Sequence, residues 1–195
     1  MALDLDGVIA SAGFASGDRF VCGLWRSSPV GVLHDVMWAR PSGERVLLVP
    51  SEVARDFVAS VYEFDRVEIV EFAVTNAGPG EVDVRSGFVR LTLTGGRAVP
   101  IPGPRPLWVT RWIEGPIART AMGVRTYGVS PTGVREWYRA RSYRRVTTGS
   151  ASIDGTDLGA LCAVEPACGF GFSEPPRRAS IVEVRPHLVF PTQEC

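Results

Sequence analysis

The densest run of side chains that could contact a ligand lies between positions 134 and 145, where arginines alternate with aromatic residues. Successive side chains of a β-strand point to opposite faces. A regular strand here would place on one face Arg135, Trp137, Arg139, Arg141, Tyr143 and Arg145. Arginine forks bind carboxylate or phosphate oxygens in pairs, and aromatic faces stack on flat organic groups. The run therefore predicts a site for a small anionic, partly apolar molecule. The candidate ligand-binding residues are Trp137, Tyr138, Arg139, Arg141, Tyr143 and Trp38.

Two other interpretations of residues 135–145 remain open. The arginine and aromatic face could bind single-stranded nucleic acid or a protein, or its arginines could be solvated and paired with acids of the first half of the chain. Residues 1–98 carry nine arginines against thirteen acids, and residues 99–195 carry twelve against eight. The halves are oppositely charged and the formal net charge is zero. This balance favours packing of the halves on each other over nucleic-acid binding, which usually needs a net basic surface.

Two acids inside otherwise apolar strands are candidate proton-transfer groups. Asp35 follows His34 and precedes Val36, and Glu136 would share its face with Val134 and Tyr138. An inward carboxyl without an arginine partner would have a raised pKa, because burial disfavours its charged form, and could act as a general acid or base. The alternative is an ordinary ion pair, since buried charges are normally paired.

Two further acids near the start of the chain form a short motif. The segment from Asp4 to Ile9 reads Asp-Leu-Asp-Gly-Val-Ile and resembles the first motif of the haloacid-dehalogenase-like phosphatases. The resemblance implies a magnesium-dependent phosphohydrolase in which Asp4 attacks phosphorus and Asp6 handles the leaving-group proton, on a fold of alternating helices and strands. It covers six residues. The alternative is an acidic turn at the terminus.

Several classes of site are excluded or disfavoured by composition. All 21 basic residues other than histidine are arginine, so a Schiff-base lysine or a P-loop lysine cannot occur. The four cysteines form no C-x-x-C pair and there are only two histidines, so we predict no metal site and no cofactor. An acidic amino terminus, the lack of any apolar stretch near 18 residues and the cysteine pattern predict a soluble cytoplasmic protein that does not enter a membrane.

The elements that must position these residues are mainly short strands. The most clearly marked is a hairpin, in which 32–40 and 45–49 flank the turn Pro41-Ser42-Gly43-Glu44. Segments 67–74, 81–85 and 88–94 predict a three-stranded antiparallel meander. Further strands are predicted at the positions 20–25, 123–129, 134–146, 149–153 and 179–185.

Two segments predict helices. Ser51 can cap a helix over residues 52–62, whose apolar residues have helical spacing. Residues 107–122 predict two short helices that meet at Gly115-Pro116. Prolines at 100, 102, 104 and 106 make 99–106 the one candidate internal boundary of what we otherwise expect to be a single domain, residues 1–195.

The pattern as a whole predicts a mainly β (α+β) fold, an antiparallel β-barrel or sandwich with two or three short covering helices. A closed barrel would be similar in fold to acetoacetate-decarboxylase-like barrels, although their Schiff-base lysine is absent. A barrel interior or mouth is a natural ligand cavity. We therefore expect a small-molecule-binding protein; catalysis, the ligand's identity and the oligomeric state stay open at this point.

Overall fold

The fold of the chain is a single curled β-sheet with one helix among the residues that the computed structural model describes, which are 1–101, 106, 108 and 124–191. The helix is α1 (Glu52–Ala59). The strands are β1 (Ala2–Asp4), β2 (Asp6–Phe14), β3 (Arg19–Ser27), β4 (Leu33–Ala39), β5 (Arg45–Val49), β6 (Arg66–Ile69), β7 (Phe72–Ala77), β8 (Glu81–Ser86), β9 (Val89–Gly95), β10 (Val99–Pro100), β11 (Tyr127–Val129), β12 (Arg135–Ile153), β13 (Thr156–Asp157), β14 (Leu161–Cys162) and β15 (Ser180–Val189).

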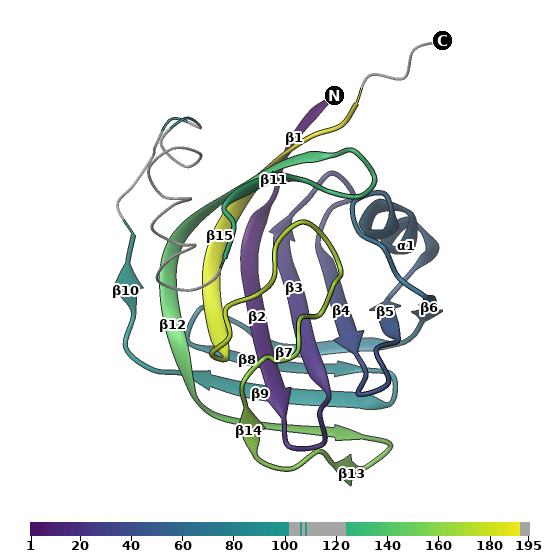
Figure 1. Ribbon diagram of the computed structural model, residues 1–195, viewed down its shortest axis with the longest axis vertical. Coiled ribbons are helices and arrows are strands. Elements are labelled where there is room, and N and C mark those ends of the chain that lie inside the picture. The colour runs from purple at the N-terminus through teal and green to yellow at the C-terminus, as the bar shows by residue number, and fades with distance from the viewer. Residues whose placement is uncertain (102–105, 107, 109–123, 192–195) are drawn as a thin grey trace.

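The long strand β12 makes the sheet fold over itself into a half-barrel. Its first part pairs with β15, which leads on through β2, β3, β4 and β5 to β6. Its second part pairs with β9, which leads to β8 and β7. In Figure 1, β7, β8 and β9 run across behind the strands β2 to β4. The two ends of this path, β6 and β7, do not pair, so the barrel is open.

A dense apolar core fills the space between these two layers. β2 contributes Val8, Ala10 and Phe14, and β9 contributes Leu91 and Leu93, all at most 3% exposed. Alternate residues of β2 and β3 point to the opposite face, where they meet a second apolar cluster. Strands β2 to β4 are therefore covered on both sides, which explains why their sequences are almost continuously apolar.

The opposite face of the sheet is covered by α1 and by the segment between β14 and β15, which crosses β2 and β3 (Figure 1). The Ser51 hydroxyl caps α1 by accepting from the Ala54 amide at 3.2 Å. Val58 of α1 is buried in the cluster. The helix connects β5 to β6 and so allows these two strands to pair in parallel, which a short turn could not do. The predicted helix is confirmed, although it ends at Ala59 instead of residue 62.

The mainly β architecture is confirmed, and three finer predictions are corrected. The sheet is open and contains the parallel pair β5–β6, so it is not a closed antiparallel barrel. The described residues hold one helix, not two or three; the second helical prediction, 107–122, lies outside them except for Trp108. The predicted strand 67–74 is two strands, because the chain leaves the first layer after β6 and enters the second at β7.

The predicted hairpin and the predicted meander are both confirmed. β4 and β5 pair across the turn at Pro41–Glu44, where Gly43 has a φ of +92°. β7, β8 and β9 form an antiparallel meander. Within the proline-rich segment, Val99 and Pro100 form β10 and pair with β12, whereas 102–105 lie outside the described residues. The number of domains stays a prediction. Among the described residues, no helix has the length and apolar character that a membrane span requires.

Candidate functional site

A cavity of about 180 Å³ lies on the face of the sheet that α1 covers. For comparison, a dry apolar cavity of about 150 Å³ can hold benzene. The walls of the cavity in this protein come from β2, β3, β4, β12 and β15, and the segment 170–176 and the end of α1 partly cover it. The described apolar residues that line it include Leu5, Ile9, Val21, Met37, Phe57, Val58, Val182, Val184 and Leu188.

A minority of the described lining residues are polar, and Thr126, Ser173 and Glu174 are among them. Asp35 comes from β4, and Ser11 and Ser180 come from β2 and β15 with their hydroxyl oxygens 3.2 Å apart. Tyr62 and Tyr138 also line the wall. No arginine or histidine is found among the described lining residues. The pocket thus has the usual form of a small-molecule site, an apolar cavity with a few placed polar groups.

Asp35 is the most unusual of these polar groups because it is 1% exposed and has no cationic partner in the described part of the chain. Its Oδ1 accepts a hydrogen bond from Trp25 Nε1 at 3.1 Å, and its Oδ2 is buried without a partner. Burial raises the pKa of Asp35 from 3.8 to about 7, although hydrogen bonds from Trp25 and the Gly23 backbone act in the opposite direction. Near neutral pH this carboxyl can therefore both accept and release a proton.

Gly23 makes the position of Asp35 possible. It lies directly opposite Asp35 in the pairing of β3 with β4. A Cβ atom at Gly23 would lie 2.5 Å from Trp25 Nε1 and closer still to Asp35 Oδ1. The missing side chain leaves room for the carboxyl and the indole to meet at the pocket wall.

Glu136 lies on the same face of β12 as Tyr138 and is fully buried. Its Oε2 lies 3.0 Å from the hydroxyls of both Tyr62 and Tyr138, and these two hydroxyls are also within hydrogen-bond distance of each other. Three oxygens therefore share three contacts. The two tyrosine protons can fill only two of them, and the third is filled only if Glu136 keeps its proton. The geometry fits a neutral Glu136.

The electrostatics of this cluster agree with that proton count. Burial raises the pKa of Glu136 from 4.5 to about 7, and the two tyrosine hydrogen bonds only partly offset it. Burial also raises the pKa of Tyr62 and of Tyr138 well above 10. Both hydroxyls therefore remain protonated and can donate hydrogen bonds.

The segment 170–176 is packed tightly on this cluster. A side chain at Gly171 would meet the Tyr62 ring at 2.7 Å, and the Phe172 ring stacks on Tyr138 with centroids 5.7 Å apart. The Glu174 carboxylate accepts from the amides of Cys168 and Gly169 at 2.6 and 2.9 Å, which closes the loop on itself. The cover over the pocket is thus held by defined contacts.

A β-bulge decides which residues of β12 face the pocket. Ala140 pairs with Val184 and Ser142 with Glu183, so Arg141 is the extra residue of the bulge. The bulge reverses the alternation, and Tyr143 lines the pocket with Tyr138 and Ala140. The prediction that Tyr143 shares a face with Arg139 and Arg141 is therefore wrong, because a regular strand was assumed.

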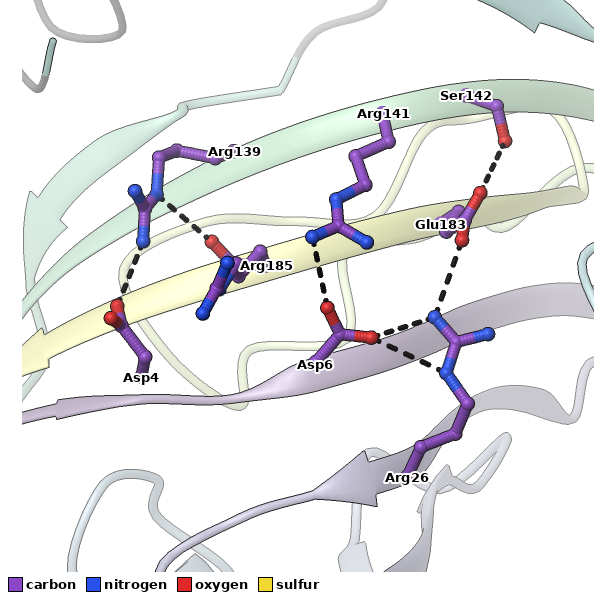
Figure 2. Close-up of polar contacts among 8 residues, drawn as sticks. All are labelled: Asp4, Asp6, Arg26, Arg139, Arg141, Ser142, Glu183 and Arg185. Carbon is purple, nitrogen blue, oxygen red and sulfur yellow. Dashed lines mark hydrogen bonds and ion pairs between the residues drawn. The ribbon is translucent and has the colours of Figure 1, made fainter. Parts of the chain in front are cut away.

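The predicted arginines lie on the other side of β12, in a network of ion pairs (Figure 2). Arg139 binds Asp4 at 2.8 Å, and Arg141 binds Asp6 at 3.0 Å. Asp6 also binds Arg26 at 2.7 Å, and Arg26 reaches Glu183 at 3.2 Å. These arginines neutralise nearby acids of β1, β2 and β15, and they are not among the described residues that line the cavity.

Two predicted aromatic contacts lie away from the cavity as well. Trp137 packs on Tyr127 and His187, with ring centroids 4.9 and 5.7 Å away. Trp38 lies in the core between the layers, where its Nε1 donates to Asp18 Oδ1 at 2.7 Å.

β1 and β2 bring Asp4 and Asp6 close together. Each carboxylate, however, is paired with an arginine in the ion-pair network on the outer side of β12, which we call the outer network (Figure 2). Asp4 Oδ1 also lies 2.9 Å from His187 Nδ1. Across the residues that the structure describes, no three His, Cys, Asp or Glu side chains are grouped as a metal ion would require. Cys22, Cys162 and Cys168 are free thiols.

Sequence reasoning missed most residues of the pocket, among them Tyr62, Ser11 and Ser180. Tyr62 follows α1 and reaches Glu136 across 74 positions, and Ser11 meets Ser180 across 169. No local pattern marks such pairs, since only the pairing of distant strands joins them. A search for similarity to known protein families, curated proteins and solved structures finds no significant match to this chain.

Proposed function

We propose that the protein binds a small, uncharged and mainly apolar molecule in the cavity beneath residues 170–176. One observation carries the proposal: a mainly apolar cavity of about 180 Å³ is lined by Asp35, whose Oδ2 is buried and has no hydrogen-bond partner. Nearly all buried polar atoms in proteins are hydrogen-bonded, and one without a partner costs about 1–3 kcal/mol. A ligand can satisfy this oxygen and fill the cavity at once.

The charges around the cavity favour an uncharged ligand over the anion that the arginines predicted. Arg139 and Arg141 are paired with Asp4 and Asp6 on the outer face. Asp35, when ionised, would repel an anion, and no described lining residue could neutralise it. The tyrosine hydroxyls can donate to a carbonyl or hydroxyl oxygen without any charge on the ligand.

The outer network gives less support to the two alternative functions. Arg26, Arg139 and Arg141 of this network face acids, which makes these three less available to bind nucleic acid. For the phosphohydrolase alternative, Asp4 and Asp6 are both engaged by arginines, and the described fold has one helix where that family alternates helices and strands.

The binding proposal can be tested with three probes of one size and different charge: benzyl alcohol, benzoate and benzylammonium. Saturation-transfer NMR and tryptophan fluorescence would measure their Kd values at pH 6. We expect benzyl alcohol to bind at least about tenfold more tightly than benzoate, a difference of about 1.4 kcal/mol. Tighter binding of either ion, or no binding of benzyl alcohol, would contradict the proposal.

A matched pair of variants locates the binding. Val182→Phe adds a ring to the cavity wall, whereas Val32→Phe makes the same change at a position that is 71% exposed. The first should abolish benzyl alcohol binding and the second should leave its Kd unchanged. Equal binding by both variants would place the ligand elsewhere.

A further inference from the structure

A side chain that can accept a proton and two side chains with hydroxyl groups line the same cavity. The acceptor is Asp35 Oδ2, which is buried and unpartnered on the wall formed by β4. The donors are Tyr62 and Tyr138, which reach the cavity from the end of α1 and from β12. Burial is the main cause of the raised pKa of Tyr138, and the charge of Asp35 adds a smaller contribution in the same direction.

The proton on Glu136 gives these donors a direction. Both tyrosine hydroxyls are placed to donate to Glu136 Oε2. With a proton on Glu136, the three protons can rearrange so that Glu136 donates to Tyr62 and Tyr62 donates to Tyr138. In that arrangement Tyr138 exchanges its hydrogen bond to Glu136 Oε2 for one to an oxygen in the cavity. Such a chain strengthens its last bond, because each donor polarises the next one.

We propose that this pocket catalyses proton transfer at a carbon atom next to the carbonyl group of a small, uncharged ketone, with Asp35 as the base and Tyr138 as the donor to the carbonyl oxygen. This inference rests on the proposed binding function and adds a reaction to it. Lysine is absent from the chain, so the carbonyl group would be activated by hydrogen bonding and not through a Schiff base.

The reaction balances without any co-reactant. Asp35 Oδ2 forms a bond to the proton of the adjacent carbon, and the C–H electron pair becomes a C=C bond. The carbonyl π electrons move onto oxygen, whose developing charge is stabilised by the Tyr138 hydroxyl. The protonated Asp35 then returns its proton to the same carbon or to a conjugated carbon two bonds further on. The outcome is exchange of the hydrogen on that carbon in the first case and migration of the double bond in the second. Neither involves oxidation or reduction.

The setting suits this chemistry for two reasons. A mainly apolar site strengthens both the carboxylate base and the hydrogen bond to oxygen, because fewer water molecules compete for them. A carboxylate base combined with a tyrosine and a protonated carboxyl group is also a known solution for stabilising an enolate in an apolar site. Here Asp35, Tyr138 and Glu136 supply those three parts.

The test uses cyclohex-3-enone, a ring of about benzene size whose isomerisation to conjugated cyclohex-2-enone is followed by ultraviolet absorbance. Binding is measured separately with cyclohexanone by saturation-transfer NMR. We expect the natural protein to accelerate the isomerisation and Asp35→Asn to lower kcat by at least about 100-fold. The Kd for cyclohexanone should change by less than about threefold, because that substitution retains size and the Trp25 hydrogen bond. Asp154→Asn, in an exposed turn, is the matched control.

Two further variants keep the test decisive if Asp35→Asn does not fold. Tyr138→Phe removes the donor to oxygen and should lower kcat by about 100-fold or more. Glu136 is a positioning residue, and Glu136→Gln stays neutral and can still donate, so it should keep kcat within about threefold. A large loss of kcat in Glu136→Gln with an unchanged KM would show that Glu136 is itself the base and would overturn the assignment.

The outcomes separate the two proposals. Cyclohexanone binding without isomerisation by the natural protein overturns the catalytic inference and leaves the binding function intact. Isomerisation that is equal in the natural protein, Asp35→Asn and Tyr138→Phe also overturns it. Absence of cyclohexanone binding overturns the binding function and the inference together.

Discussion

The buried carboxyl of Asp35 should make the protein less stable as the pH rises from about 4 to about 7. Burial raises the pKa of Asp35 from 3.8 to about 7 in the folded chain. In that window the folded chain keeps a proton that the unfolded chain has lost. Stability falls with pH wherever the unfolded state binds fewer protons, so the free energy of unfolding decreases across the window and levels off above it.

The size of the effect follows from the shift in pKa. An increase of about three units in the pKa of Asp35 corresponds to about 4 kcal/mol of free energy, at 1.36 kcal/mol per unit. Asp35→Asn removes this contribution, because an amide has no proton to lose. Its carbonyl oxygen can still accept from Trp25 Nε1. Near pH 4 the variant and the natural protein should be similar in stability, and at pH 8 the variant should be more stable by up to about 4 kcal/mol.

Urea unfolding monitored by tryptophan fluorescence at several pH values between 4 and 8 would measure this difference. Asp154→Asn makes the same chemical change in an exposed turn, where the φ of 49° suits asparagine equally, and it should parallel the natural protein. Glu136 is present in all three proteins and cancels in the comparison. If Asp35→Asn and the natural protein have parallel stability profiles, Asp35 is not an unpaired buried acid and the reasoning fails.

Four further substitutions test other parts of the site and the outer face of β12. Gly23→Ala forces a Cβ atom against Asp35 and should lower the free energy of unfolding by about 1–3 kcal/mol in urea titrations. An unchanged free energy of unfolding would mean that the strands around Asp35 can move to accommodate the methyl group. Tyr62→Phe removes one donor to Glu136 and should cost about 1–3 kcal/mol by thermal unfolding, whereas equal stability would contradict the shared-proton cluster. Arg139→Ala and Arg141→Ala should each cost less than about 1 kcal/mol and leave the benzyl alcohol Kd unchanged; lost binding would move the ligand site to the outer face.

The parts of the fold that follow from local chemistry were predictable from the sequence. The turn at Pro41–Glu44 needs a positive φ at Gly43, and the Ser51 cap starts α1, so both elements were identified with near-correct bounds. The parallel pairing of β6 and the open end of the sheet depend on contacts between distant strands. No residue of β6 signals whether its neighbour will be β5 or β7.

Some residues of the candidate site could also be predicted from the sequence, and others could not. Asp35 and Glu136 stood out because each is an acid in an apolar strand, and the structure buries both without an arginine partner among the described residues. Their roles stay predictions. The bulge at Arg141 could not be foreseen, since nothing in an arginine-rich strand marks the position of an extra residue, and it alone moves Tyr143 to the pocket face. Tyr62 and the serine pair depend on long-range pairing.

A crystal structure of the protein grown with cyclohex-2-enone would test the central claim most directly. The account predicts one ordered ring in the cavity beneath residues 170–176, with its carbonyl oxygen within hydrogen-bond distance of the Tyr138 hydroxyl and its ring carbons facing Asp35. A cavity filled only by water, or a ring bound on the outer face beside Arg139 and Arg141, would contradict it.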